Sequence, residues 1–133
     1  MLMSYRRWSL VLAVVVCLVP VLAHAQGGRL TPLVSGWERF FSVSSETVQK
    51  GDKTRVVGYL GNEAGFHAKR MRLLIDGFDA SGQIVGQSLA YVPSPNPGPG
   101  GRVYFDEPAP AGVRHRVSVF AYDWVQSAMN DAP

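Results

Sequence analysis

The sequence predicts one all-β domain, an antiparallel sandwich of six to seven strands, preceded by an export signal. Three observations predict it. After residue 30 the chain is rich in β-branched and aromatic residues, which alternate with polar residues as in half-buried strands. Turn-forming residues interrupt these segments about every 8 to 12 residues, as sandwiches require. No segment there repeats apolar residues at helical spacing for three turns.

The first 25 residues have the three parts of a secretory signal peptide. Arg6 and Arg7 form a basic start, residues 10–22 form an apolar run, and small residues stand at Ala23 and Ala25. The run is too short to cross a bilayer, which takes about 20 residues. We therefore expect cleavage after Ala25, a mature chain without a stable membrane span, and a periplasmic or secreted location.

Two other interpretations of this signal are weaker. A twin-arginine signal would use the same basic pair, but Trp8 and Ser9 follow it. Lipid attachment would use Cys17, but this cysteine lies in the middle of the apolar run and follows Val16.

Composition limits the partners and the means of stabilisation. Cys17 is the only cysteine, so the mature domain has no disulfide and depends on burial alone. The chain has 13 basic and 10 acidic residues, a net charge of +3, and removal of Arg6 and Arg7 leaves 11 against 10, or +1. Such a balance is not typical of proteins that bind nucleic acid or anionic membranes, so we expect neither as a partner.

The mature chain begins with a predicted flexible leader over residues 26–36, which contains glycine and Pro32 without a sustained period. The sandwich domain is expected over residues 37–126. Its first strand is predicted over 37–48 and its second over 54–60, with a polar turn around Gly51 between them.

The third strand has the clearest alternation. Met71, Leu73 and Ile75 point one way, and Arg72, Leu74 and Asp76 point the other way. Residues 79–82 (Asp-Ala-Ser-Gly) predict a hairpin turn, and residues 83–92 predict the return strand.

Residues 93–101 hold four prolines and three glycines and are expected to form a loop. Strands follow over 103–106 and 114–125, and a flexible tail is expected over 127–133. In the last strand the pattern places Val117, Val119 and Ala121 opposite a second set: Ser118, Phe120, Tyr122 and Trp124. Strands this close in sequence pair antiparallel, because a parallel pair needs a long crossover.

Three segments carry motifs of one known family. Residues 57–63 (VGYLGNE) are similar to a "G-x-V-x-N" strand, residues 73–82 (LLIDGFDASG) to an aromatic-Asp element, and residues 99–105 (PGGRVYF) to a "P-x-G-x-x-x-F" element. In these segments the chain resembles a small exported bacterial domain, the FxLYD type. Gly77 departs from the pattern, since an apolar residue is usual there. The resemblance implies an immunoglobulin-like β-sandwich and no particular activity.

The candidate catalytic and metal-binding residues are few. The mature chain has no cysteine and only His67 and His115 as histidines, so a nucleophile–base pair is not indicated. Hydrolysis through Asp76, Asp79 or His115 is a third hypothesis, but turn capping and solvation explain these residues better. The same holds for Asp106 and Glu107 at a strand end. We expect no enzyme activity, no metal and no cofactor.

Aromatic residues give the one functional indication. Phe78, Phe105 and Phe120 are expected in the core. Four tyrosines are expected to share the outer face of one sheet as a candidate contact face: Tyr59, Tyr91, Tyr104 and Tyr122. We therefore expect a non-catalytic envelope module that contacts another protein. Carbohydrate or peptidoglycan binding through these tyrosines is the alternative, and cross-strand pairing that only stabilises the sheet is the third account of them.

Overall fold

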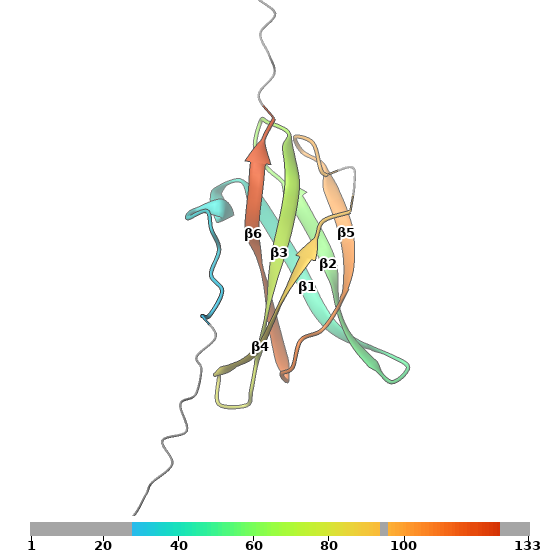
Figure 1. The fold of residues 1–133 in the computed structure, drawn as a ribbon. Coiled ribbons are helices and arrows are strands. Elements are labelled where there is room, and N and C mark those ends of the chain that lie inside the picture. Colours follow the sequence, from blue (N-terminus) through green and yellow to red (C-terminus); the bar gives the residue numbers. More distant parts are fainter. Residues whose placement is uncertain (1–27, 94–95, 126–133) are drawn as a thin grey trace, which may run out of the picture.

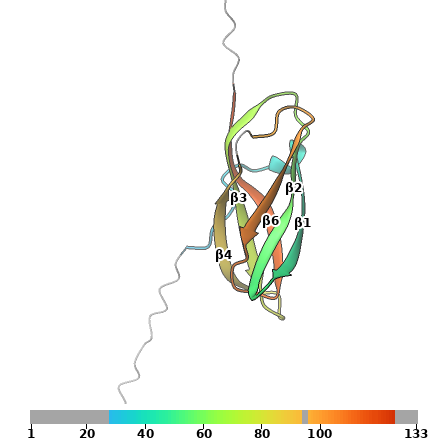
Figure 2. The same cartoon turned by 90° about the vertical axis from the view of Figure 1, so that its right-hand side faces the viewer.

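A computed structural model describes residues 28–93 and 96–125, and it confirms the predicted all-β sandwich. Six antiparallel strands form two three-stranded sheets that face each other (Figures 1 and 2). The predicted signal peptide, its cleavage site and the tail over 127–133 lie outside the described residues.

The first sheet has the strand order β1-β2-β5: β1 (Phe41–Lys50), β2 (Lys53–Asn62) and β5 (Arg102–Pro108). β1 and β2 form a hairpin in which Phe41 pairs with Asn62 and Lys50 with Lys53. Gly51 has a φ of 67°, which fits the tight turn expected there.

The second sheet has the strand order β4-β3-β6: β4 (Ile84–Tyr91), β3 (Ala68–Phe78) and β6 (Arg114–Trp124). The predicted turn after β3 is present, and Asp79 caps it. Its carboxylate accepts hydrogen bonds from the backbone N–H groups of Ser81 and Gln83, each at 2.9 Å. β3 and β2 are the central strands of their sheets, and each pairs with a neighbour on both sides.

The core lies between the sheets and takes alternate residues from every strand, as the period of two requires. Burying a side chain such as leucine or phenylalanine stabilises the fold by about 1.5–3 kcal/mol. The largest core side chains are Phe41, Leu60, Met71, Leu73, Ile75 and Phe105.

A pair of glycines lets a loop cross the inner side of the second sheet. Gly77 and Gly86 are register partners on β3 and β4. A Cβ at Gly77 would lie 1.9 Å from the carbonyl oxygen of Ala111, and one at Gly86 would lie 2.8 Å from it. The backbone of the loop before β6 therefore occupies the space that a side chain at Gly77 would take.

Two β-bulges change which side chains face the core. On β3, Leu73 pairs with Val119 of β6, and the preceding residue Arg72 pairs with Ala121. Phe120 lies between these two partners and has no partner on β3. On β3 a second irregularity lies between Lys69 and Arg72, where Arg70 has a φ of 50°. The extra residue at Phe120 reverses the alternation in the rest of β6.

The segment of residues 28–36, which we call the strap, lies along the outer face of the second sheet (Figure 1). The side chain of Gln87 accepts a hydrogen bond from the backbone N–H of Leu30 and donates one to its carbonyl oxygen, both at 2.9 Å. The N–H of Leu33 donates to the carbonyl oxygen of Phe120 at 2.8 Å. The sequence predicts a flexible leader here, whereas these hydrogen bonds hold the segment on the sheet.

The strap explains why four outward-pointing residues of the second sheet are buried outside the core: Leu74, Asp76, Ser118 and Phe120. Of the phenylalanines expected in the core, only Phe105 belongs to it; Phe120 lies on the outer face and Phe78 is half-buried. The backbone between the strap and β1 also corrects the predicted start of the first strand. Gly36 has a φ of 76°, and Trp37–Arg39 form a 3-10 turn that leads the chain from one sheet to the other.

Asn62 joins two loops at one end of the sandwich. Its side chain is 1% exposed. The Nδ2 group donates to the carbonyl oxygens of Phe66 at 2.8 Å and Pro97 at 3.0 Å, and Oδ1 accepts from the N–H of Ala64 at 2.9 Å. Asn62 is thus a structural residue with satisfied polar groups.

Candidate functional site

Two of the four candidate tyrosines lie together on the outer face of the first sheet. Tyr59 on β2 and Tyr104 on β5 are register partners, and their ring centroids are 5.3 Å apart at an interplanar angle of 63°. They are 42% and 46% exposed. Directly opposed residues on neighbouring strands are close enough for such edge-on aromatic contact.

The other two tyrosines lie elsewhere, so the prediction of a single four-tyrosine face is wrong. Tyr91 is on β4 of the second sheet and is 75% exposed. Tyr122 on β6 packs against the core, 4.7 Å from the ring of Phe41. The bulge at Phe120 is the reason for the error at Tyr122, because it turns the residues after it to the opposite face.

Partial burial of Tyr122 raises the pKa of its phenol above the ordinary value. Phe41, Tyr122 and Trp124 form an aromatic cluster at this end of the sandwich, with centroid distances of 4.7 to 5.6 Å. Tyr122 is therefore part of the packing.

Polar residues surround the Tyr59–Tyr104 pair. The guanidinium of Arg102 lies over the ring of Tyr59, 4.6 Å from its centroid. Ser44 of β1 is the register partner of Tyr59 on the other side. A shallow hollow of about 300 Å³ lies beside the pair and is lined by Ser44, Ser45, Glu46, Val57, Gly58, Tyr59 and Tyr104. We call Tyr59, Arg102 and Tyr104 the tyrosine patch.

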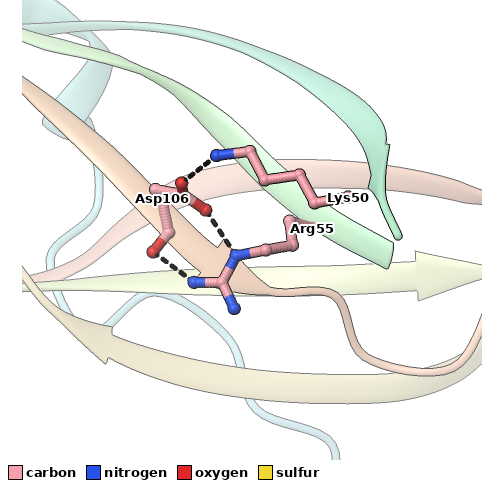
Figure 3. A network of polar contacts seen from close by, with 3 residues as sticks. All are labelled: Lys50, Arg55 and Asp106. Atoms are coloured by element: carbon pink, nitrogen blue, oxygen red, sulfur yellow. Dashed lines mark hydrogen bonds and ion pairs between the residues drawn. The ribbon is translucent and has the colours of Figure 1, made fainter. Parts of the chain in front are cut away.

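An ionic network ties the three strands of the first sheet next to this patch (Figure 3). Lys50 of β1 and Arg55 of β2 both pair with the carboxylate of Asp106 on β5, and Arg55 Nη2 also donates to the carbonyl oxygen of Asp106 at 2.9 Å. Hydrogen bonds from Lys50, then from Arg55, hold the pKa of the Asp106 carboxyl below its usual value. Asp106 is therefore a charged structural group at neutral pH.

Its neighbour Glu107 has the opposite environment. Partial burial raises the pKa of the Glu107 carboxyl above its ordinary value, against the lowering effect of Arg55. The pKa values of these two adjacent carboxyls thus shift in opposite directions, because Asp106 has two cationic hydrogen-bond donors and Glu107 is partly desolvated.

The remaining candidate catalytic residues have structural partners. His115 Nε2 donates to the carbonyl oxygen of Pro110 at 2.8 Å, and its Nδ1 lies 3.0 Å from Thr47 Oγ1 on the opposite sheet. His67 lies against Gly98, where a Cβ would approach its ring to 2.8 Å. These contacts give both histidines a packing role.

Asp76 and Asp79 also serve the fold. Asp76 is 3% exposed and accepts hydrogen bonds from Gln87 at 2.7 Å and Arg116 at 2.8 Å. The Asp79 carboxylate accepts from the Ser81 hydroxyl at 2.7 Å, and this bond is the main cause of its lowered pKa. Across residues 28–93 and 96–125, no group of three or more His, Cys, Asp or Glu side chains is placed to hold a metal ion.

Comparison of the chain with protein-family models, curated proteins and solved structures finds no match. In the described part of the chain, no helix has the length and apolar character needed to span a membrane.

Proposed function

We propose that the protein is an exported, immunoglobulin-like, non-catalytic module of the bacterial envelope that binds another protein through the tyrosine patch. The strand orders β1-β2-β5 and β4-β3-β6 support the fold part of this proposal. They correspond to the A-B-E and C′-C-F strands of immunoglobulin sandwiches. The N-terminal pattern of basic, apolar and small residues supports export.

The exposed Tyr59–Tyr104 pair with Arg102 is the observation that carries the binding proposal. Tyrosine and arginine are the residue types that most often dominate the energy of protein interfaces, together with tryptophan. Here they project from paired strands that the Asp106 network holds together, so little conformational entropy is lost on binding.

The geometry favours a protein over a sugar as the ligand. Sugars stack on the open face of an aromatic ring, but the guanidinium of Arg102 lies over Tyr59. The two rings also meet at 63° and do not form one flat platform. Protein side chains can instead pack on the ring edges and pair with the guanidinium.

Carbohydrate or peptidoglycan binding is the second candidate. The hollow of about 300 Å³ beside Tyr104 supports it. Ser44, Ser45 and Glu46 are among the residues that line this hollow, and hydroxyl and carboxylate groups can hydrogen-bond a sugar.

Site-specific photocrosslinking in the producing bacterium tests the proposal. A benzophenone amino acid is placed at Tyr104, and in a matched control at Phe66, which is 66% exposed and outside the patch. We expect a discrete protein adduct from position 104 and none from position 66. Equal adducts at both positions, or none at 104, would contradict the proposal.

A second experiment separates the two candidates. Purified protein is sedimented with peptidoglycan and compared with the Tyr59→Ala/Tyr104→Ala variant. We expect no sedimentation of either form. If the wild type sediments with peptidoglycan and the double variant does not, the ligand of the patch is a glycan and not a protein.

A further inference from the structure

The outer face of the second sheet has a hollow that the tyrosine patch does not include. Its volume is about 460 Å³. The strap contributes one wall, and β3, β4 and β6 contribute the rest. The lining residues are Leu33, Val34, Arg70, Arg72, Tyr91, Ala121, Tyr122 and Asp123.

Of the two arginines that line this hollow, Arg72 has no carboxylate partner among the described residues. It lies at the centre of the sheet, between Tyr91 on β4 and Ala121 on β6. Its guanidinium lies over the buried Phe120 ring, 5.2 Å from the ring centroid, in a cation–π contact. Among the described residues, no Asp or Glu oxygen lies within 4 Å of the guanidinium, whereas the neighbouring Arg70 pairs with Asp123 at 2.6 Å.

The surroundings of Arg72 are mostly apolar and open. Leu33 of the strap is 67% exposed, and Tyr91 is 75% exposed. Leu89, the next outward residue on β4, is 41% exposed. Arg72 as a residue is half-buried. A partly buried cation gains more from an anion than a fully solvated one does, because water screens it less.

The backbone around Arg70 is unusual for a residue with a side chain. Its φ of 50° lies in the left-handed region, at the β3 irregularity. Arg70 and Asp123 both line the hollow, and their ion pair balances one positive charge with one negative charge. The net charge that remains available to a ligand is therefore that of Arg72.

We propose that this hollow is a second binding site, which takes a carboxylate with an apolar neighbour, as an acidic residue beside an aliphatic residue in a peptide provides. The planar guanidinium of Arg72 donates two parallel hydrogen bonds to the carboxylate. The Tyr91 hydroxyl is a further donor, and Leu33 and Val34 cover the apolar group. The site lies on the sheet opposite the tyrosine patch and does not depend on the function proposed for that patch.

An NMR titration of the purified protein tests this site with defined probes. N-acetyl-leucine supplies a carboxylate beside an aliphatic side chain, and N-acetyl-leucine amide is the same probe without the charge. We expect saturable shifts at the amides of Arg72, Tyr91 and Ala121 with the acid, and none with the amide. Equal shifts from both probes would overturn the proposal, since the guanidinium would then have no role.

Two variants and one control test the assigned residues. Arg72→Gln should bind N-acetyl-leucine about tenfold or more weakly, because a charged hydrogen bond is lost. Tyr91→Ala, at an exposed position with little effect on folding, should weaken binding severalfold. Lys69→Gln removes one exposed positive charge from the same strand and should leave binding unchanged. Unchanged binding in both Arg72→Gln and Tyr91→Ala would overturn the site.

Inorganic phosphate is the third probe, and it tests the class of anion. Tighter binding of phosphate than of N-acetyl-leucine at the same amides would overturn the carboxylate assignment. Weaker binding would support it. The dispersion of each amide spectrum shows whether a variant has folded, so a folding defect is not mistaken for lost binding.

Discussion

At the scale of single residues, small side chains and buried amides decide whether the two sheets can close. Gly77 has no side chain because the carbonyl of Ala111 occupies its place, and Asn62 is buried because it satisfies three backbone groups of two loops. In the sequence, Asn62 lies in a segment that resembles a family motif and Gly77 departs from one, and neither structural role follows from that. Their roles depend on residues 34 or 35 positions away in the chain, Ala111 and Pro97, which alternation along a strand does not report.

Gly77→Ala should destabilise the protein by about 1–3 kcal/mol, because the new Cβ must displace the backbone of Ala111. Urea denaturation measures the loss. Gly65→Ala is the matched control, since its Cβ meets open space among the described residues. Equal stability of the two variants would show that the loop does not lie against Gly77.

Asp79 should contribute a pH-dependent part of the stability. Hydrogen bonds in the turn lower its folded pKa, so the unfolded state binds more protons and stability rises with pH. The contribution is present above the unfolded value of about 3.9 and is lost as the pH falls through the lower folded pKa. Urea midpoints measured from pH 6 to pH 2 should therefore fall less steeply for Asp79→Asn than for the wild type. Parallel curves would argue against the cap.

At the scale of elements, alternation predicted all six strands, and three local features escaped it. The bulge at Phe120 adds one residue to β6, and no residue type in the sequence indicates it. Regular alternation therefore predicts Tyr122 on the outer face, whereas it packs against the core. The strap was predicted as a flexible leader because its hydrogen bonds come from Gln87 and Phe120, which are distant in sequence. The pairing of Tyr59 with Tyr104 depends on the β2–β5 register, which no single strand contains.

Gln87→Ala should release the strap and leave the buried carboxylate of Asp76 with one hydrogen bond fewer. We expect a loss of about 1–3 kcal/mol in the free energy of unfolding. Amide hydrogen exchange of Leu33 should also become faster, because its bond to Phe120 depends on a docked strap. Gln49→Ala removes an exposed glutamine from β1 and serves as the control. Unchanged Leu33 exchange in the Gln87 variant would mean that Gln87 does not hold the strap.

At the scale of the whole molecule, the two sheets share one core but differ on their outer faces. The second sheet is partly covered by the strap, which buries Leu74 and Phe120. The first sheet has no such cover among the described residues and exposes Tyr59 and Tyr104. This asymmetry is why we propose contact between the tyrosine patch of the first sheet and a partner protein.

Hydroxyl-radical footprinting of the tyrosines, read by mass spectrometry, tests this assignment most directly. In purified protein, Tyr59 and Tyr104 should be oxidised rapidly and Tyr122 slowly, in line with their exposure. Addition of envelope extract should then protect Tyr59 and Tyr104 while the exposed ring of Phe66 stays reactive. Rapid oxidation of Tyr122, or an extract that leaves the tyrosine patch as reactive as before, would contradict the account.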